Sequence, residues 1–363
     1  MSEATSLASL TTMRVGGPPR ALLTATTPEE VVEAVASVDR AGEPLLVLGG
    51  GSNLLVADEG FAGTVVQVAT RGITVESADA CGGVVVRVAA GEVWDDVVAR
   101  AVVEGWSGIE ALSGIPGSTG ATPVQNVGAY GQEVAQTVMH VRVWDRTEAR
   151  LRTLFNADCE FTYRHSLLKE SMRVAGQVTP RYVVLDVTFQ LHPTELSQPI
   201  GYADLARGLG VEPGARVPLP EAREAVLEQR RRRGMVLDEA DHDTWSCGSF
   251  FTNPILPREQ YAELVARAAA RLGATGPVPP KFPGGDGMVK TSAAWLIDKA
   301  GFAKGHGLPG PAALSTKHTL ALTNRGSARA ADLVALAREV RAGVREAFGV
   351  TLVNEPVLVG LSL

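Results

Sequence analysis

The hydrophobic and polar residues of this chain follow two different periods, which predicts a mixture of strands and helices. Short apolar runs bounded by glycine or polar residues are typical of strands. Such runs lie at 21–25, 45–49, 54–58, 73–89, 138–144, 149–155, 183–191, 315–323 and 350–363. Apolar residues at helical spacing predict helices at 28–41, 91–105, 220–234, 258–272 and 328–348, with shorter ones within 197–214 and through 295–297. The fold class expected from this order is α+β.

The first helix has start and stop signals that can be checked residue by residue. Thr27 stands where an N-cap is expected, Pro28 suits the first helical position, and Glu30 completes a capping box. Gly42 is the expected end of this helix.

A glycine-rich stretch from Gly105 to Glu133 is the most unusual segment of the chain. It has seven glycines and two prolines in 29 residues but very few charges, unlike a solvated linker. Glycines let a backbone approach another group closely, and the many N–H groups of such a loop need acceptors. Two interpretations remain open at this point: a bound anionic cofactor supplies those acceptors, or the stretch is a packed Ω-loop.

A second glycine cluster, Gly49 to Asn53, follows a predicted buried strand. A dinucleotide-binding turn of the Rossmann type is excluded, because the spacing is not G-x-G-x-x-G and another extended run follows instead of a helix. The cluster is either a nest of N–H groups for an anion or a tight turn between strands.

Composition and charge exclude several classes of protein. The chain has 363 residues and a net charge of −6, which gives no indication of a nucleic-acid partner. No apolar run approaches the roughly 20 residues of a membrane span, and the N-terminus lacks the pattern of a signal peptide. We therefore expect a cytoplasmic protein with free thiols at Cys81, Cys159 and Cys247. The scattered histidines predict no metal site.

Four groups of polar residues stand in positions that suit chemistry as well as a structural role. Arg164 is either a surface ion-pair partner or a clamp for a carboxylate. Ser249, beside two phenylalanines, either caps a turn or faces a ligand. Glu355 interrupts an apolar run, which is costly unless the carboxylate is exposed, paired or used. The arginines 230–233 are either a solvated helix end or a site for an anionic group.

Taken in order, the motifs resemble the UDP-N-acetylenolpyruvoylglucosamine reductases over nearly the whole chain. The resemblance rests on TMRVGG (12–17), VLGGGSNLLVAD (47–58), SGIPGSTGATPVQNVGAYGQEV (113–134), FTYRHSLLK (161–169), GSFFTNP (248–254), AAWLIDKAGFAKG (293–305) and NEP (354–356). The glycine segments alone indicate only the wider FAD-binding superfamily shared with vanillyl-alcohol oxidase. The resemblance implies a two-subdomain FAD-binding fold of that type, followed by a C-terminal α+β substrate-binding domain.

The domain boundaries implied by the resemblance follow the motifs. Residues 1–72 form the first FAD-binding subdomain, which the C-terminal 350–363 joins. Residues 73–235 form the second, with a substrate loop near 197–214, and 236–349 form the substrate-binding domain.

The reaction implied by the resemblance is the NADPH-dependent reduction of UDP-N-acetylglucosamine enolpyruvate, through non-covalent FAD, in peptidoglycan precursor synthesis. Hydride is added at C3 of the enolpyruvyl group, and a general acid protonates C2. Arg164 matches the position that stabilises charge on the carboxylate. Ser249 matches the proton donor, and Glu355 matches the position that supports the intermediate. We expect a monomer that needs no metal.

The resemblance also implies binding residues. For FAD these are Gly49, Gly50, Gly51, Ser52, Asn53, Ser113, Ile115, Pro116, Gly117, Ser118, Gly120, Ala121, Gln125, Asn126, Gly128, Tyr130 and Gly131. For the substrate they are Tyr163, Tyr202, Arg232, Arg233, Asn253, Phe282 and His318.

Two positions depart from the family pattern. A lysine that binds the diphosphate in relatives falls in register on Met235, so Arg232 or Arg233 is expected to replace it. Phe282 stands where relatives have a tyrosine near the uridine. The competing functions are another FAD-dependent oxidase of the superfamily and a non-catalytic nucleotide-sugar binding protein. A non-catalytic binding protein would be expected to lack the three catalytic residues, and Arg164, Ser249 and Glu355 are all present.

Overall fold

The computed structural model describes residues 5–79, 82–172 and 177–363, and Cys81 lies outside these ranges. The chain forms two compact units. Unit 1 contains Pro18–Gly51 and Phe61–Val236, and unit 2 contains Ser6–Gly17, Ser52–Gly60 and Leu237–Leu363. Both predicted FAD-binding subdomains therefore contribute to unit 1. The predicted boundary between them at 72/73 stays a prediction.

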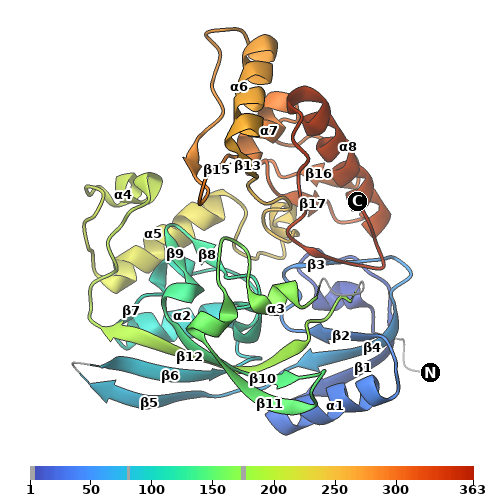
Figure 1. Ribbon diagram of the computed structural model, residues 1–363, viewed down its shortest axis with the longest axis vertical. Helices are drawn as coiled ribbons and strands as arrows, with labels where there is room; N and C mark the ends of the chain where they lie inside the picture. The colour runs from blue at the N-terminus through green and yellow to red at the C-terminus, as the bar shows by residue number, and fades with distance from the viewer. Residues whose placement is uncertain (1–4, 80–81, 173–176) are drawn as a thin grey trace. The chain divides into compact units, whose positions relative to one another are not determined.

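Unit 1 contains a parallel three-stranded sheet and a mainly antiparallel six-stranded sheet (Figure 1). The first has the order β1 (Pro19–Ala25), β4 (Phe61–Val68) and β2 (Leu45–Leu48). The second has the order β11 (Arg150–Phe155), β10 (Val138–Asp145), β12 (Tyr182–Pro193), β6 (Gly83–Ala89) and β5 (Ile73–Asp79). Its sixth strand, β7 (Trp106–Ser107), pairs with β12. A two-stranded ribbon, β8 (Gly128–Ala129) with β9 (Gln132–Glu133), lies within the glycine-rich stretch.

One helix of unit 1 begins and ends where local sequence signals predict. Helix α1 spans Pro28–Arg40, and the capping box of Thr27 and Glu30 is present. In Figure 1 this helix runs along one side of β1 and β4. The other helices are α2 (Trp94–Val103), α3 (Leu167–Glu170), α4 (Ala203–Leu209) and α5 (Leu219–Arg232).

One hydrophobic core joins the two sheets of unit 1. Val35 of α1, Val66 of β4, Val86 of β6, Trp94 of α2 and Phe189 of β12 all belong to it, and each is almost completely buried. Burying side chains of this size contributes about 1.5–3 kcal/mol each. The core therefore fixes the sheets to each other and provides a rigid base for the loops that leave them.

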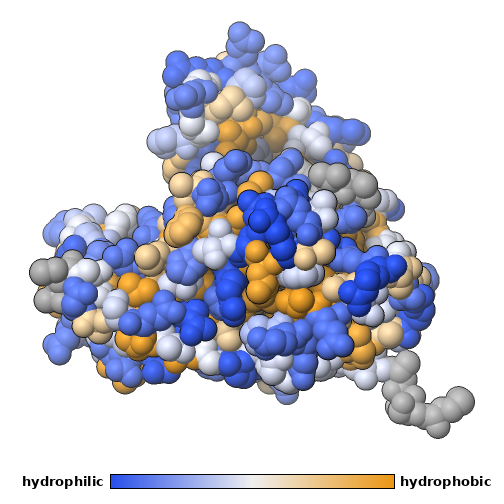
Figure 2. All heavy atoms as spheres, turned by 60° about the horizontal axis from the view of Figure 1, so that its bottom comes forward, coloured by the Kyte–Doolittle hydropathy of each residue, from blue (hydrophilic) through white to orange (hydrophobic). Residues whose placement is uncertain are grey.

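Figure 2 turns the lower side of Figure 1 toward the viewer, and its orange hydrophobic areas form separate patches among blue hydrophilic ones. Large hydrophobic side chains are exposed on β11, where Leu151 and Phe155 are 55% and 57% exposed. Single apolar side chains at a surface are ordinary and indicate no partner by themselves.

Unit 2 packs three helices with short strands. The helices are α6 (Arg258–Leu272), α7 (Ala293–Ala300) and α8 (Ala330–Phe348). The strands are β3 (Leu54–Val56), β13 (Ile255–Pro257), β14 (Phe282–Pro283), β15 (Met288–Lys290), β16 (Ala312–Leu314), β17 (Leu322–Asn324) and β18 (Val357–Val359). Asp58 caps α8, because its carboxylate accepts the N–H groups of Ala330 and Ala331 at 2.8 and 3.1 Å.

Two strand predictions in unit 2 were wrong in extent. Residues 315–321 form a turn between β16 and β17, because the Ser315 hydroxyl accepts the N–H groups of Lys317 and His318 and bends the chain, and the end of the predicted run, Leu322 and Thr323, belongs to β17. The C-terminal run 350–363 is a strand only over Val357–Val359, where β18 pairs in parallel with β3. Polar residues interrupt both runs, and their local hydrogen bonds replace those of a sheet.

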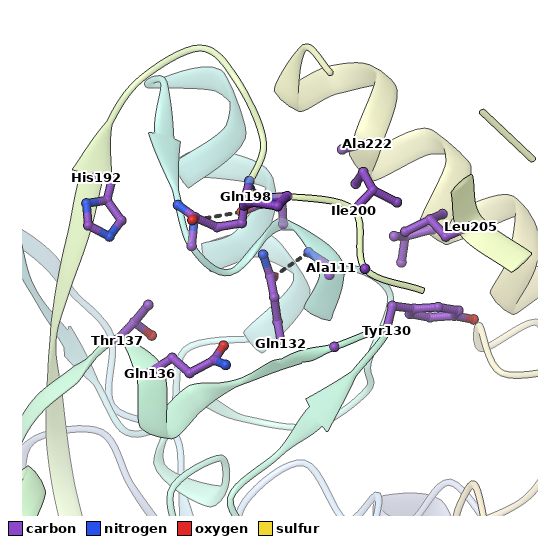
Figure 3. Close-up of a pocket in the computed structure, with 16 residues that line it drawn as sticks. Ala111, Tyr130, Gln132, Gln136, Thr137, His192, Gln198, Ile200, Leu205 and Ala222 are labelled. Carbon is purple, nitrogen blue, oxygen red and sulfur yellow. Dashed lines mark hydrogen bonds between the residues drawn. The ribbon is translucent and has the colours of Figure 1, made fainter. Parts of the chain in front are cut away.

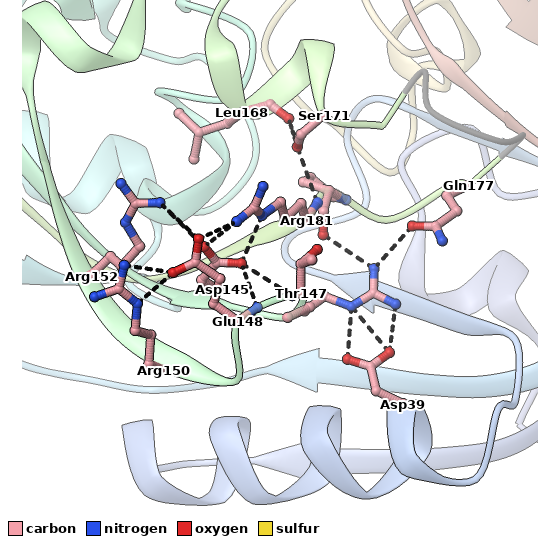
Figure 4. A network of polar contacts seen from close by, with 12 residues as sticks. Asp39, Asp145, Thr147, Glu148, Arg150, Arg152, Leu168, Ser171, Gln177 and Arg181 are labelled. Atoms are coloured by element: carbon pink, nitrogen blue, oxygen red, sulfur yellow. Dashed lines mark hydrogen bonds and ion pairs between the residues drawn. The ribbon is translucent and has the colours of Figure 1, made fainter.

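A buried carboxylate, Asp145 at the end of β10, anchors a polar network in unit 1 (Figure 4). It accepts hydrogen bonds from Arg181 at 2.7 and 2.8 Å, from Arg152 at 3.3 Å and from the Glu148 N–H at 3.2 Å. Burial alone would raise the pKa of Asp145. The hydrogen bonds to its carboxylate have the larger effect, and together they lower the pKa to about 2. Beside this network, Arg146 pairs with Asp39 of α1 at 2.6 Å and thereby links the β10–β11 turn to that helix.

We predict that Asp145→Asn destabilises the protein by about 2–4 kcal/mol at pH 7, because two arginines lose a buried charged partner. The folded pKa lies below the unfolded value of about 3.9, so the stabilisation is present at neutral pH and is lost as pH falls toward 2. Urea unfolding at pH 7 and pH 3 measures both effects, with exposed Glu33→Gln as control. Equal stability of the variant and the wild type at pH 7 would refute the role of the network.

Candidate active site

The two glycine clusters of the sequence meet in unit 1, although about 70 residues separate them. A Cβ atom on Gly50 would lie 2.6 Å from Cα of Gly117, and one on Gly49 would lie 2.2 Å from Oγ of Ser118. Real Cβ atoms do not approach other atoms so closely, so only glycine fits at Gly50 without movement of the facing backbone. The glycines are therefore required for the contact between two loops.

This contact leaves hydrogen-bond donors at the turn. Among the described residues, we find no acceptor within the chain for the backbone N–H groups of Gly49, Gly50 and Gly51. Successive N–H groups of this kind form an anion-binding nest, and buried ones need a partner. The phosphates of a dinucleotide suit this donor set, whereas a plain turn between strands would satisfy its own N–H groups.

The remaining glycine-rich stretch is held mainly by its own side chains and by its neighbours. Asn126, 1% exposed, donates to Glu133 and to the Thr162 carbonyl, both at 2.9 Å, and accepts the Ala135 N–H at 3.2 Å. The Ser113 hydroxyl donates to the Glu110 carbonyl at 2.6 Å. These two predicted cofactor residues thus have structural hydrogen bonds, so the Ω-loop interpretation is correct for part of the stretch.

The other predicted cofactor residues of unit 1 lie along the same loop. Ser118 forms a bridge with Val93, next to α2. Tyr130 has a left-handed backbone, with φ of 51°. The rest follow one another along the stretch: Ile115, Pro116, Gly117, Gly120, Ala121, Gln125, Gly128 and Gly131. Ser52 and Asn53 belong to unit 2, where the Asn53 carbonyl accepts the Val357 N–H at 3.0 Å.

Arg164 lies against the glycine-rich stretch. It occupies a tight turn in which Thr162 and His165 exchange hydrogen bonds at 3.1 Å, and its own φ is 54°. Its guanidinium donates to the carbonyls of Asn126 and Gly128 at 3.3 and 2.8 Å and lies 5.4 Å from the ring of Tyr163. The left-handed backbone and the two carbonyls aim the side chain along the loop.

Ser249 and Glu355 lie close together in unit 2. The Glu355 N–H donates to the Phe250 carbonyl at 2.8 Å, and Phe251 forms a bridge with Asn354. Phe250 and Phe251 are buried in the core of unit 2, so this contact has a rigid support. Ser249 and Glu355 are both half-buried and stand next to the anchored residues. Arg164 belongs to unit 1, and its approach to these two residues stays a prediction.

Glu355 also affects the thiol of Cys247. Burial, with a smaller contribution from the Glu355 charge, raises the pKa of Cys247 to about 12, and the thiol donates a hydrogen bond to the Leu54 carbonyl. Cys247 and Cys159 are free thiols, as predicted, and burial also raises the pKa of Cys159 to about 12. Neither thiol is ionised near pH 7, so neither suits nucleophilic chemistry.

The predicted substrate residues divide between the two units. In unit 1, Tyr202 at the start of α4 packs edge-on against Tyr130 with 5.4 Å between ring centroids. Arg233 approaches Asp204 at 3.3 Å and is half-buried, whereas Arg232 pairs with Glu228 on an exposed side of α5. In unit 2, Asn253 accepts the Ala293 N–H at 3.0 Å, Phe282 is 46% exposed, and His318 lies in the turn after β16.

The sequence analysis missed Glu110 and did not single out Arg230 among the arginines 230–233. Arg230 is the inward-facing arginine of its run: its Nε is buried, it donates to the Met235 carbonyl at 2.7 Å, and burial lowers its pKa to about 10. Glu110 is 2% exposed and belongs to the glycine-rich stretch. The sequence did contain one indication that Glu110 is unusual, because it is the single charged residue between Gly105 and Gln132.

Comparisons with known proteins agree with this arrangement. A family model for an FAD binding domain matches residues 19–154, and one for the UDP-N-acetylenolpyruvoylglucosamine reductase C-terminal domain matches residues 239–359. The UDP-N-acetylenolpyruvoylglucosamine reductase of Streptomyces coelicolor is 59% identical over 358 residues, which cover 98% of this chain and 90% of that protein. The chain belongs to the UDP-N-acetylenolpyruvoylglucosamine reductases.

Two further reductases of this name support the assignment. That of Thermobifida fusca is 57% identical, over 98% of this chain and 97% of its own length. The crystal structure of the Thermus caldophilus reductase matches with a TM-score of 0.63 and 27% identity, over 98% of this chain and 97% of that one.

As a UDP-N-acetylenolpyruvoylglucosamine reductase, the chain is an FAD-dependent oxidoreductase of peptidoglycan precursor synthesis that uses NADPH. The predictions of the family, of FAD and of an α+β FAD-binding fold followed by a C-terminal domain are confirmed. No described helix is long and apolar enough to cross a membrane. Among the described residues, no cluster of histidine, cysteine and acidic side chains is arranged to hold a metal ion.

We predict that Gly50→Ala weakens FAD binding in this reductase, because the added methyl group pushes the turn away from Gly117 at a cost of about 1–3 kcal/mol. Fluorescence titration of the apoprotein with FAD measures the change. Gly201→Ala is the matched control, since a Cβ there meets no atom within 4 Å. Unchanged FAD affinity in Gly50→Ala would contradict the role of the close contact.

Proposed function

We propose that this chain reduces UDP-N-acetylglucosamine enolpyruvate to UDP-N-acetylmuramate, with Ser249 as the proton donor. Membership of the reductase family supports the reaction class. The observation that carries the assignment of residues is the contact that holds Ser249 next to Glu355, the 2.8 Å hydrogen bond from the Glu355 N–H to the Phe250 carbonyl. We also propose that the enzyme is a cytoplasmic monomer.

Bound FAD supplies the ability to accept a hydride from NADPH and to give it to the vinyl carbon of the substrate. The N–H groups of Gly49–Gly51 suit its phosphates, and the loop from Ser113 to Gly131 suits the rest of the molecule. The close contact between these two segments keeps their donors in place before the cofactor binds. Preorganised donors of this kind bind without reordering the chain.

The protein groups act on the carboxylate and on C2 of the substrate. Addition of hydride at C3 increases the negative charge on the carboxylate attached to C2, and a fixed cation lowers the energy of that state. Arg164 is such a cation, because two carbonyls and a tight turn hold its guanidinium. Ser249 then gives its proton to C2. A serine is a weak acid, so a nearby group must assist, and we assign this role to Glu355.

For the diphosphate of the substrate we propose Arg233 rather than Arg232. Arg233 is half-buried beside Tyr202 and Asp204, on the side of α5 that faces the predicted substrate loop. Arg232 is 67% exposed and is engaged by Glu228 one helical turn earlier. A half-buried guanidinium gives stronger hydrogen bonds to a phosphate than a solvated one.

We predict that Ser249→Ala keeps reduction of the flavin by NADPH but slows reduction of the substrate by about 10²–10⁴-fold, because the proton donor is lost. Anaerobic stopped-flow absorbance follows the two half-reactions separately. Thr252→Val serves as control, since its hydroxyl contacts only the Val353 carbonyl, at 3.3 Å, among the described residues. Equal loss of both half-reactions in Ser249→Ala would contradict the assigned role.

The same spectra test the competing functions. A flavin that is bleached by NADPH and recovers with UDP-N-acetylglucosamine enolpyruvate supports the proposal. Recovery with oxygen alone would favour an oxidase. Bound flavin with no turnover would favour a nucleotide-sugar binding protein.

We predict that Arg233→Ala raises KM for the UDP-linked substrate by about 10-fold or more, because a charge-assisted hydrogen bond contributes about 1.5–3 kcal/mol. Arg232→Ala, which removes the same charge from the same helix end, should change KM less than about 2-fold. Steady-state kinetics with saturating NADPH give both values. A larger effect at Arg232 than at Arg233 would reverse the assignment.

A further inference from the structure

Glu110 is a buried carboxylate that connects two segments far apart in the sequence. Its Oε1 accepts the N–H of Gln198 at 2.6 Å, and its Oε2 accepts the N–H of Gly108 at 2.6 Å. Burial of a carboxylate is unfavourable unless such hydrogen bonds compensate for lost water. Short bonds to an ionised acceptor are among the stronger ones in proteins. The connection to Gln198 therefore makes a substantial contribution to holding that segment.

Gln198 lies at the base of the loop that carries Tyr202. The base is closed by hydrogen bonds between backbone groups: Ser197 N–H to the Val217 carbonyl at 2.8 Å, and Ile200 N–H to the Ala215 carbonyl at 2.9 Å. Helix α4 lies within this loop, and Tyr202 at its start packs against Tyr130. A shift of the base would therefore move Tyr202.

A cavity of about 290 Å³ lies behind the base of the loop (Figure 3). Gln132, Gln136 and Thr137 line it from the glycine-rich side, and Ile200 and Leu205 line it from the loop. Ile200 and Leu205 also pack with Ala111 and Val226 in one buried apolar cluster. Apolar contacts and hydrogen bonds therefore both position the base of the loop beside the cavity, and the hydrogen bond from the Gln198 N–H to Glu110 has an acidic side chain as its acceptor.

We propose that Glu110 is a positioning residue for substrate binding, which holds the base of the Tyr202 loop at the place where Tyr202 meets the substrate. The inference rests on the proposed role of Tyr202. Glu110 contacts neither the reacting atoms nor the cofactor in this role. It acts through the Gln198 N–H, and the bond to Gly108 keeps the carboxylate oriented toward it.

A competing role for Glu110 is support of the cofactor loop. It belongs to a short 3-10 helix, Glu110–Leu112, that leads directly into Ser113, and the adjacent Ala111 N–H donates to Gln132 at 2.8 Å. That role would change FAD binding and flavin reduction, whereas positioning of Tyr202 changes KM for the substrate. The two roles are therefore separable by measurement.

The test uses Glu110→Gln in the FAD-loaded enzyme. Glutamine has one acceptor oxygen where glutamate has two, so it keeps one of the two N–H bonds and faces the other with a donor. We expect KM for UDP-N-acetylglucosamine enolpyruvate to rise by about 10-fold, with kcat, FAD affinity and the rate of flavin reduction by NADPH within about 3-fold of wild type. Loss of FAD affinity or flavin reduction comparable to the rise in KM would overturn the proposal.

Two control variants belong to this experiment. Gln198→Ala removes a side chain that donates to Ser107 at 3.0 Å but leaves the backbone N–H on Glu110, so KM should change by less than about 3-fold. Glu104→Gln removes an equal charge from an exposed position at the end of α2 and should have no effect. A rise in KM of equal size in Glu104→Gln and Glu110→Gln would assign the effect to net charge and overturn the proposal.

Tyr202→Ala separates failure of this inference from failure of the proposed function. If Tyr202→Ala raises KM and Glu110→Gln does not, the role of Glu110 is wrong and that of Tyr202 stands. If Tyr202→Ala leaves KM unchanged, the proposed role of Tyr202 is wrong and the inference falls with it. In a Tyr202→Ala background, Glu110→Gln should add less than about 2-fold to KM. Independent, multiplicative effects would show that Glu110 does not act through Tyr202.

Discussion

The close contact between Gly50 and Gly117 is the constraint on which the cofactor site of unit 1 depends. Backbone meets backbone there, with no room for a Cβ atom on Gly50. The contact joins the strand end after β2 to the glycine-rich stretch that begins after α2. A shared hydrophobic core fixes both starting points, so the two loops reach the same place in every molecule. The N–H groups of Gly49, Gly50 and Gly51 belong to the turn that this contact holds.

Side-chain hydrogen bonds complete this loop system. Asn126 holds the glycine-rich stretch to the turn that carries Arg164, through the Thr162 carbonyl. Arg164 in turn donates to the carbonyls on either side of Val127. Polar groups of the stretch therefore satisfy one another, while Ile109 and Leu112 anchor it in the core of unit 1. The orientation of the Arg164 guanidinium is thus set by the loop itself.

Local signals made much of the fold predictable. The capping box of Thr27 and Glu30 depends on residues three apart, and α1 begins there. The run 315–323 was predicted as a strand because of its apolar content. The Ser315 hydroxyl instead forms a turn there by accepting hydrogen bonds from two backbone N–H groups. The residues of the candidate site were found through motifs, since the contact between Phe250 and Glu355 spans about 100 residues and no local period reports it. Glu110 was missed because its acceptor role depends on Gln198, 88 residues away.

Cys247 stands two residues before Ser249, and its environment has a consequence for chemical labelling. Its thiol is buried, donates to the Leu54 carbonyl and has the negative charge of Glu355 nearby. Electrophiles such as maleimides and acrylamides react with thiolates, and with a pKa of about 12 the thiolate is a minute fraction at neutral pH. Covalent inhibitors aimed at this cysteine would therefore react with it only slowly. The same protonated state slows oxidation of the residue to a sulfenic acid, so the buried position of the thiol also protects this part of unit 2 under oxidative conditions.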